Sequence, residues 1–441
     1  MGDLKIDRLF IGDELSQATT TLEFQGRAME LGFSGTLSER TLAKILTGHR
    51  LQDGWIKGDF KASIVPDDPL RSTAQGRVDV RRLSVPWRFE RPVEIDEISL
   101  EGKGNHILVT RGMFRWGDTD ATLSGDVNFS EGKVFFDMDL AADRLDLNEV
   151  KKALGKGKGG KGDKGTHEGS GLRVEGRVRF KSESLTYDRF TSSPFQAELS
   201  FVPGHLHVDV TEANVCGIST AGKVDVAPND LFLDAQTLAK NRALDSVVRC
   251  LFEERMAMTG GFDLTAVLRG QGEPDRLAPL LRGNLEIVAK KGRIYKFNFL
   301  SKVFSFINVT GIVKGTLPDF HDKGFVYDSI KVRADLENGK VLIREATLKG
   351  PTVQLAWIGE IDPFNKEIEM KVLVSPLRTV DSVISRIPVI NKLLGGTLLF
   401  IPERVRGELE DPRVTPLSPE AVVSHLLGIM KRTLEDRKSV V

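Results

Sequence analysis

The chain has 441 residues, of which 40% are hydrophobic and 28% are charged, a composition typical of a folded protein. Lys plus Arg and Asp plus Glu both number 62, so the formal net charge is zero. Because proteins that bind nucleic acid normally carry a basic excess that meets phosphate, this balance argues against nucleic acid as a partner. The length allows two or three ordinary domains or one extended repetitive one.

The first 24 residues contain neither the apolar core of a signal peptide nor a stretch long enough to span a bilayer. The chain opens almost directly on a strand-like segment, Leu4–Phe10. We therefore expect it to be the downstream part of a longer polypeptide.

Most of the chain consists of short segments in which apolar and polar residues alternate. Ala121, Leu123 and Gly125 are followed by Val127 and Phe129 at every second position, and the residues between them are polar. Side chains alternate sides along a strand, so each such segment predicts a strand with one apolar and one polar face. The pattern recurs in the ranges 4–36, 54–140, 172–226, 259–296, 324–374 and 396–409.

A few segments instead have apolar residues at helical spacing. Helices are predicted at 37–46, 233–256, 299–307, 376–394 and 419–437. In the second of these, the candidate core contacts are Leu238, Val247, Val248, Leu251 and Phe252. The last one carries its apolar residues on one side, so it is either a lid packed on its own domain or a helix that binds a membrane surface or a partner.

The range 151–171 alternates Gly and Lys and has no apolar residue after Leu154. Such a stretch cannot bury enough surface to order itself, so we interpret it as a flexible linker rather than a basic patch for anionic lipid headgroups. It separates an N-terminal β-repeat segment from the remainder. The predicted segments are 1–150, 151–171, 172–310, 311–419 and 420–441.

The chain has two cysteines, Cys216 in a predicted strand turn and Cys250 in a predicted helix. Nothing in the sequence fixes their geometry, and one pair is no disulfide framework, so we do not expect a disulfide. So few cysteines are compatible with either a reducing or an oxidising compartment.

Three stretches share one order of strands and turns, at 112–140, 213–238 and 346–374. Each pivots on a glycine near an acidic residue, at Gly125, Gly222 and Gly359 respectively. Repeated units that each expose an apolar face must stack on their neighbours, which favours an elongated, curved antiparallel sheet of hairpins. Hairpin repeats can also close into a two-sheet sandwich.

The run from Gly315 to Asp362 resembles the AsmA-like C-terminal family, the group of AsmA, YhdP and TamB-type envelope proteins of Gram-negative bacteria. The resemblance continues through SPLRTVDSVISRIPVINKLLGG (375–396) and RVRGELEDPRVTPLSP (404–419), so it covers the last third of the chain specifically. It implies a periplasmic protein associated with the inner membrane, whose long sheet forms an apolar-lined groove. It also implies transport of phospholipids towards the outer membrane and a role in outer-membrane biogenesis. This chain lacks the N-terminal membrane helix of that family.

On this hypothesis, apolar side chains of the strands line a path for phospholipid acyl chains, and inner- and outer-membrane proteins are possible partners. The expected lining residues are Val178, Phe180, Leu206, Val208, Val332, Leu336, Leu355, Trp357, Met370 and Val372. The alternative hypothesis is a structural or tethering β-sandwich of the envelope that carries no lipid.

No motif for catalysis is present in the sequence: it has no Gly-x-Ser-x-Gly elbow, phosphate-binding loop or His-Glu-x-x-His helix. Only His205 and His207 share a strand face, and we interpret them as solvated rather than metal-bound. We therefore expect a protein that is not an enzyme and that has no cofactor or metal.

Overall fold

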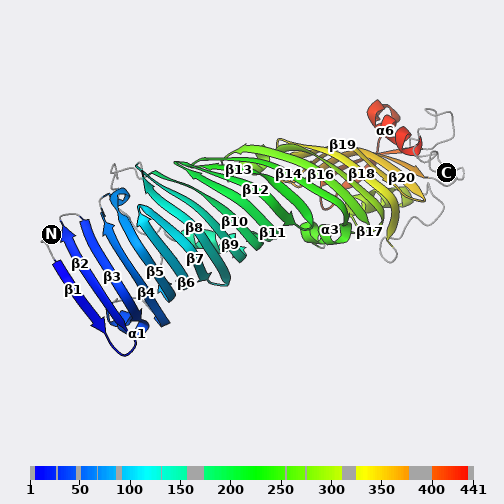
Figure 1. Ribbon diagram of the computed structural model, residues 1–441. Coiled ribbons are helices and arrows are strands. Elements are labelled where there is room, and N and C mark those ends of the chain that lie inside the picture. The colour runs from blue at the N-terminus through cyan, green and yellow to red at the C-terminus, as the bar shows by residue number, and fades with distance from the viewer. Residues whose placement is uncertain are drawn as a thin grey trace. The chain divides into compact units, whose positions relative to one another are not determined.

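In the part of the chain that the structure describes, the fold is mainly β, with 23 strands of one sheet and six α-helices (Figure 1). This confirms the predicted fold of repeated antiparallel hairpins with a few helices, one of them C-terminal. The computed structural model describes residues 5–25, 28–45, 51–66, 68–85, 92–130, 132–155, 173–253, 256–273, 276–309, 324–376 and 400–435.

Two units make up the chain. Unit 1 comprises residues 1–213 and 225–228, and unit 2 comprises 214–224 and 229–441. The division lies at β12 (His205–Val215) and β13 (Ile218–Ala227), some 40 residues after the Gly/Lys-rich range that the sequence suggested as a boundary.

Unit 1 is a succession of neighbouring strands, each hydrogen-bonded to the next in sequence from β1 to β11. All of these pairings are antiparallel except that of β9 with β10. The strands are β1 (Lys5–Gly12), β2 (Gln17–Gln25), β3 (Ala28–Ser38), β4 (Leu51–Ile64), β5 (Thr73–Val85), β6 (Val93–Gly104), β7 (His106–Trp116), β8 (Thr119–Ser130), β9 (Lys133–Asp146), β10 (Arg173–Tyr187) and β11 (Phe190–Val202).

The parallel pairing gives the Gly/Lys-rich range a topological role. Arg173 at the start of β10 lies beside Lys133 at the start of β9, so the chain must travel back along the whole of β9 before β10 can begin. Parallel neighbours need such a crossover of a dozen or more residues. It starts as helix α2 (Leu147–Gly155), which the sequence did not predict, and the rest of the predicted linker lies outside the described residues.

Unit 2 continues with antiparallel pairings in the order β14, β16, β17, β18, β19, β20, β21, β22 and β23. The two-residue strand β15 (Ala257–Met258) pairs with β17. The other strands are β14 (Asp230–Ala243), β16 (Gly261–Gly272), β17 (Arg282–Lys296), β18 (Phe325–Glu337), β19 (Lys340–Lys349), β20 (Val353–Asp362), β21 (Glu367–Pro376), β22 (Ile401–Glu408) and β23 (Arg413–Pro416).

The helices agree with the sequence in part. Helices α1 (Glu39–Ile45), α5 (Asn298–Val309) and α6 (Ser424–Glu435) lie within predicted helical segments or overlap them closely. The predicted helix at 233–256 is wrong over its first half, because β14 runs to Ala243 and only α3 (Leu244–Phe252) follows. The range 376–394 falls outside the described residues from 377 on. The remaining helix is α4 (Leu277–Leu280), and short 3-10 turns occur at Pro69–Arg71 and Pro419–Ala421.

The five candidate core residues in the range 233–256 differ in their burial. Val247 and Val248 of α3 are buried, as predicted, and Leu251 packs partly against the core. Leu238 is 42% exposed because it lies on the polar face of β14, and Phe252 is 45% exposed at the end of α3. The predicted helix was therefore wrong for Leu238, whereas Phe252 lies in a helix as predicted but is not part of the core.

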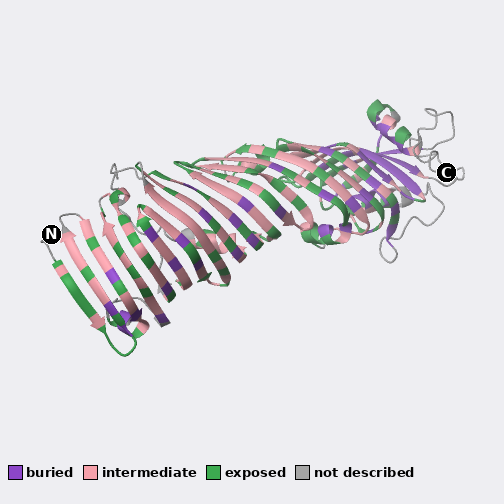
Figure 2. Ribbon diagram, in the orientation of Figure 1, coloured by how far each residue is buried: buried purple, intermediate pink, exposed green. Residues whose placement is uncertain are grey.

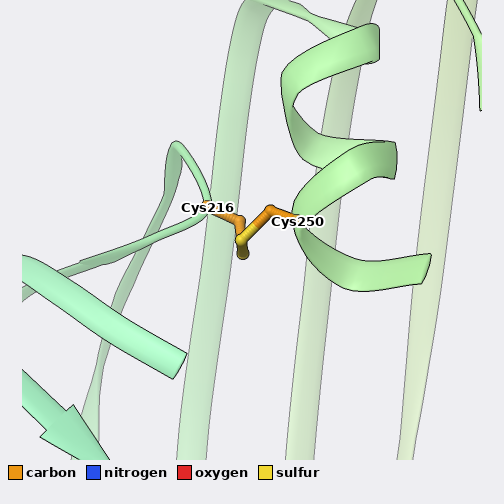
Figure 3. The surroundings of a disulfide bond; sticks show 2 residues. All are labelled: Cys216 and Cys250. Carbon is orange, nitrogen blue, oxygen red and sulfur yellow. A yellow bond between two sulfur atoms is a disulfide. The ribbon is translucent and has the colours of Figure 1, made fainter. Parts of the chain in front are cut away.

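Cys216 and Cys250 form a disulfide, which corrects the expectation of free thiols (Figure 3). Cys216 lies in the turn between β12 and β13, Cys250 lies in α3, and their Cα atoms are 5.7 Å apart. The disulfide could not be predicted because it depends on a tertiary contact: α3 folds back onto the strands before it, and the sequence does not show this. The bond spans 34 residues of sequence, and both cysteines belong to unit 2.

The three glycine pivots of the sequence repeat share one geometry. At each, a Cβ atom would collide with the carbonyl oxygen of an acidic residue on the neighbouring strand, so only glycine fits. The distances from the ideal Cβ to that oxygen are 2.2 Å for Gly125 and Asp137, 2.3 Å for Gly222 and Asp234, and 2.1 Å for Gly359 and Glu369.

Candidate functional site

The strand registers place the alternating apolar residues of unit 1 on one face of the sheet, here called the apolar face. Because directly paired residues point to the same side, the pairings trace rows of side chains that run from strand to strand. One such row crosses β3 to β11 with only apolar residues or glycine: Leu37, Ile56, Val80, Ile98, Gly112, Leu123, Leu140, Phe180 and Ala197.

Unit 2 has an equivalent row on its own apolar face, but it ends differently. Successive direct pairs lead from β14 to β22 through Ala239, Leu264, Ile287, Val332, Ala346, Trp357, Val372 and Glu403. Seven apolar residues are thus followed by a carboxyl group.

Among the described residues, the core cluster on the apolar face of unit 1 lies near the start of the unit. Helix α1 contributes Leu42 to a small core with Ala18, Phe33 and Leu37, and the side chains packed around it come from β1, β4 and β5. From β6 to β11, no described residue belongs to a core cluster. In this region single buried residues such as Val109 and Phe180 alternate with half-exposed apolar neighbours (Figure 2).

In unit 2 the apolar face is covered by its own helices. Helix α5 inserts Phe299, Leu300, Val303 and Phe304, each at most 6% exposed, into a core formed with the strands. The ring of Phe299 packs on Trp357 of the unit 2 row, with centroids 5.7 Å apart. Helix α3 adds its buried side chains to the same core, and the strands near the C-terminus are accordingly the most buried in Figure 2.

The opposite face of unit 1 is polar and held by ion pairs between strands. Arg179 of β10 lies 2.5 Å from Asp137 and 2.6 Å from Asp139 of β9, and Lys133 lies 2.9 Å from Glu175. The hydrogen bond from Arg179 lowers the pKa of Asp139 below its ordinary value. These side chains remain partly exposed, so the face is one that water solvates.

The outer face of unit 2 has a cover of its own near the C-terminus. Leu426, Ile429 and Met430 of α6 are fully buried against Ala356 and Leu373, which point away from the apolar face. The helix packs on β19, β20 and β21, so the interpretation as a lid on its own domain is confirmed (Figure 1). The strands beneath it are therefore buried on both sides.

The ten predicted lining residues fall into two groups. The members from β10, β12 and β18 lie in places where side chains stay half-buried, except Phe180, which is 7% exposed. The half-buried ones are Val178, Leu206, Val208, Val332 and Leu336. The members from β20 and β21 are at most 6% exposed in the core with α5, so protein rather than a ligand covers them here: Leu355, Trp357, Met370 and Val372.

Glu403 is the functional candidate that sequence reasoning missed. Its side chain is fully buried on the apolar face of unit 2, and neither carboxylate oxygen has a hydrogen-bond partner among the described residues. Burial raises its pKa to about 9, so at neutral pH it is an uncharged acid. A signal was present: Ile401, Glu403 and Val405 occupy alternate positions, so the glutamate takes an inward site in an otherwise apolar series.

Two other polar features are a pair of histidines and a hollow on the polar side of unit 1. The rings of His205 and His207 stack 6.2 Å apart, and His207 pairs with Asp225. Among the residues that the structure describes, no three His, Cys, Asp or Glu side chains are placed to hold a metal ion. A hollow of about 560 Å³ lies mainly on the polar side of β6 to β11, near Arg115 and Lys181, and none of the predicted lining residues borders it.

Within the described ranges, none of the helices has the length and apolar character needed to cross a bilayer. Comparison with protein-family models, curated proteins and solved structures found no match to this chain.

Proposed function

We propose that this protein binds phospholipid acyl chains along the apolar face and carries them between the membranes of a Gram-negative envelope, in support of outer-membrane biogenesis. The observation that carries the proposal is the stretch of that face from β6 to β11, which no core cluster of described residues covers. An exposed apolar patch of more than a few hundred Å² marks an interaction surface in a soluble protein. Burial there stabilises a bound chain by roughly 25 cal/mol per Å².

The geometry favours hydrocarbon over a protein partner as the missing cover. The apolar row crosses nine strands without an interruption by a charged residue, which suits a uniform chain with no polar groups of its own. A second sheet or helix would present backbone and polar side chains that need partners on this face. The proposed ligand therefore makes nonspecific apolar contacts and slides along the row.

The disulfide supports a location outside the cytoplasm. Disulfides form and persist in oxidising compartments, which include the bacterial periplasm, and are rare in the cytosol. The bond between Cys216 and Cys250 thus agrees with the periplasmic location that the AsmA-like resemblance implies.

A charge on the uncovered face tests the proposal. The Leu123→Glu variant places a carboxylate in the middle of the unit 1 row, where charging an acyl-chain site lowers affinity by more than about tenfold. The matched control is Thr122→Glu, one residue away and exposed on the polar face. Both variants are assayed for phospholipid that co-purifies and for lipid transfer between vesicles.

The proposal expects the Leu123→Glu variant to lose bound lipid and transfer, and the Thr122→Glu variant to retain both. Equal transfer by the two variants, or an unsubstituted protein that contains no phospholipid and transfers none, contradicts it. Circular dichroism of both variants establishes that a loss of transfer is not a loss of fold.

The alternative of a lipid-free β-sandwich requires a second sheet packed over the apolar face. The strands are assigned to a single sheet, and from β6 to β11 no core cluster of described residues covers that face. No observation favours this alternative over the lipid-binding face.

A further inference from the structure

Helix α5 occupies the apolar face of unit 2 as a tethered insertion. The pairing of β17 with β18 reaches Ile294 and Phe325, so the two strands adjoin at the point where the chain leaves for α5. The 30 residues between those two positions therefore replace a tight hairpin turn. A segment attached in this way can leave the face without any change of strand register.

Within the described ranges, two polar contacts join helix α5 to the turn between β22 and β23. The Asn298 side chain donates a hydrogen bond to the carbonyl oxygen of Glu410 at 3.0 Å, and Lys302 forms an ion pair with Asp411. Both acceptors lie in the turn between β22 and β23. The Asp411 side chain is 74% exposed, and such exposed pairs contribute little. Helix α5 is held mainly by the apolar side chains that it shares with the sheet.

Glu403 lies on the same face and in the same core region. It pairs directly with Val372, which pairs with Trp357, and the ring of Trp357 contacts Phe299 of α5. Helix α5 also approaches β23, the strand that pairs with Glu403 through Pro416. A carboxyl group is thus enclosed at the covered end of the unit 2 row.

No described charged group on the surrounding elements faces Glu403. On β21 the inward residues are Ile368, Met370, Val372 and Val374, and on β23 they are Val414 and Pro416. The neighbours on β22 are Ile401, Val405 and Gly407. On α5 the only charged residue is Lys302, which pairs with Asp411 instead.

We propose that α5 is a plug that acyl chains displace from the apolar face of unit 2, and that its displacement uncovers Glu403, which then releases a proton. This rests on the proposed function, because the acyl chains that displace α5 are the ligands proposed there. The plug resembles the ligand that it excludes, since Phe299, Leu300, Val303 and Phe304 fill the space that hydrocarbon would take.

The direction of the pH effect follows from the two states. When α5 is in place the pKa of Glu403 is about 9, and when water reaches the carboxyl it returns towards the ordinary 4.5. Between these values the closed state binds one more proton than the open state, so closure weakens as the pH rises. The opening equilibrium therefore increases up to about tenfold per pH unit between pH 5 and 8.

Thiol labelling measures this opening without reference to lipid. Since Cys216 and Cys250 are bonded to each other, a Val303→Cys variant has one reactive thiol, which is buried when α5 is closed. A Ser305→Cys variant has an exposed thiol on the same helix and gives the intrinsic rate at each pH. The ratio of the two rates reports the open fraction, with and without vesicles of phosphatidylethanolamine and phosphatidylglycerol.

We expect the ratio to rise with pH, to become independent of pH when Glu403→Gln is added, and to increase at least tenfold at pH 7 when lipid is bound. A ratio that is independent of pH with Glu403 present, or bound lipid that leaves the ratio unchanged, overturns the proposal. A pH-dependent ratio without any lipid binding overturns the proposed function instead. Hydrogen exchange of the α5 amides gives the same comparison if the Val303→Cys variant does not fold.

Discussion

Strands β6 to β11 in unit 1 and strands β18 to β22 in unit 2 each carry an apolar face, but the described residues that pack on these faces differ. In unit 1 the row through Leu123 and Leu140 shares no core cluster with any described helix, whereas in unit 2 the row through Trp357 and Val372 packs with α5. Alternation of apolar and polar residues therefore specifies which face of a strand is apolar, but it does not specify what covers that face. A helix of the same chain and a bound ligand are both compatible with the alternation.

The largest expected effect comes from placing the same charge in both regions. Leu355→Glu puts a carboxylate at a fully buried site, and loss of roughly 4–5 kcal/mol or more of stability is expected for an unpaired buried charge. Leu123→Glu, at a half-buried site, is expected to cost only about 1–2 kcal/mol. Denaturant unfolding of the two variants measures the difference. Equal losses would mean that unit 1 has a cover too.

The disulfide distinguishes the two units, because both of its cysteines lie in unit 2. Replacing both cysteines by serine frees a 34-residue loop and is expected to cost about 4 kcal/mol by loop-closure entropy. Hydrogen exchange should speed up in α3 and β14 before any change appears in β6 to β9. Faster exchange confined to unit 1 would contradict the assignment of the bond to unit 2.

Substitution of Gly125 and Gly359 tests whether glycine has the same structural role in the strands of both units. Gly125 has a φ of +137° and Gly359 a φ of +150°, and each faces a carbonyl oxygen that a Cβ would strike. Gly125→Ala and Gly359→Ala should each lose roughly 2–3 kcal/mol through strain and displacement of the neighbouring strand. The control is Gly132→Ala in the β8–β9 turn, which meets no atom within 4 Å and should lose about 1 kcal/mol or less.

The smallest effect is expected on the polar face. Arg179→Ala removes ion pairs with Asp137 and Asp139, but all three side chains are at least one-third exposed, so the loss should be about 1 kcal/mol or less. Lipid transfer should be unchanged. Urea unfolding and the vesicle assay check the two statements, and a loss of transfer with an intact fold would move the lipid path to the other face.

The sequence was sufficient to predict the strands and, for most of them, which side chains lie on the apolar face, because the alternation of apolar and polar residues is a local pattern. It was also sufficient for α5, whose apolar residues recur at helical spacing. It failed at 233–256, where β14 carries Leu238 on its polar face and so mimics a helical stripe. Propensity cannot decide such a segment, because tertiary pairing with β16 does.

The candidate site was predictable only in part, since coverage depends on contacts distant in the chain. One local signal was present in β20 and β21, where Leu355, Ala356 and Trp357 are consecutive and apolar instead of alternating. Such runs indicate burial on both faces, which α5 and α6 supply. The disulfide and the parallel step from β9 to β10 had no comparable local signal.

Strand direction also determines where the chain can accommodate change. Within unit 1, β3 and β9 run the same way, so α1 and α2 both depart from one side; within unit 2 the same holds for β14 and β17, which precede α3 and α5. The opposite ends in unit 2 include tight reversals such as Asn338–Gly339. Within each unit, these helices thus follow strands that run in one direction, and they are inserted at that end without a break in the pairing of the strands.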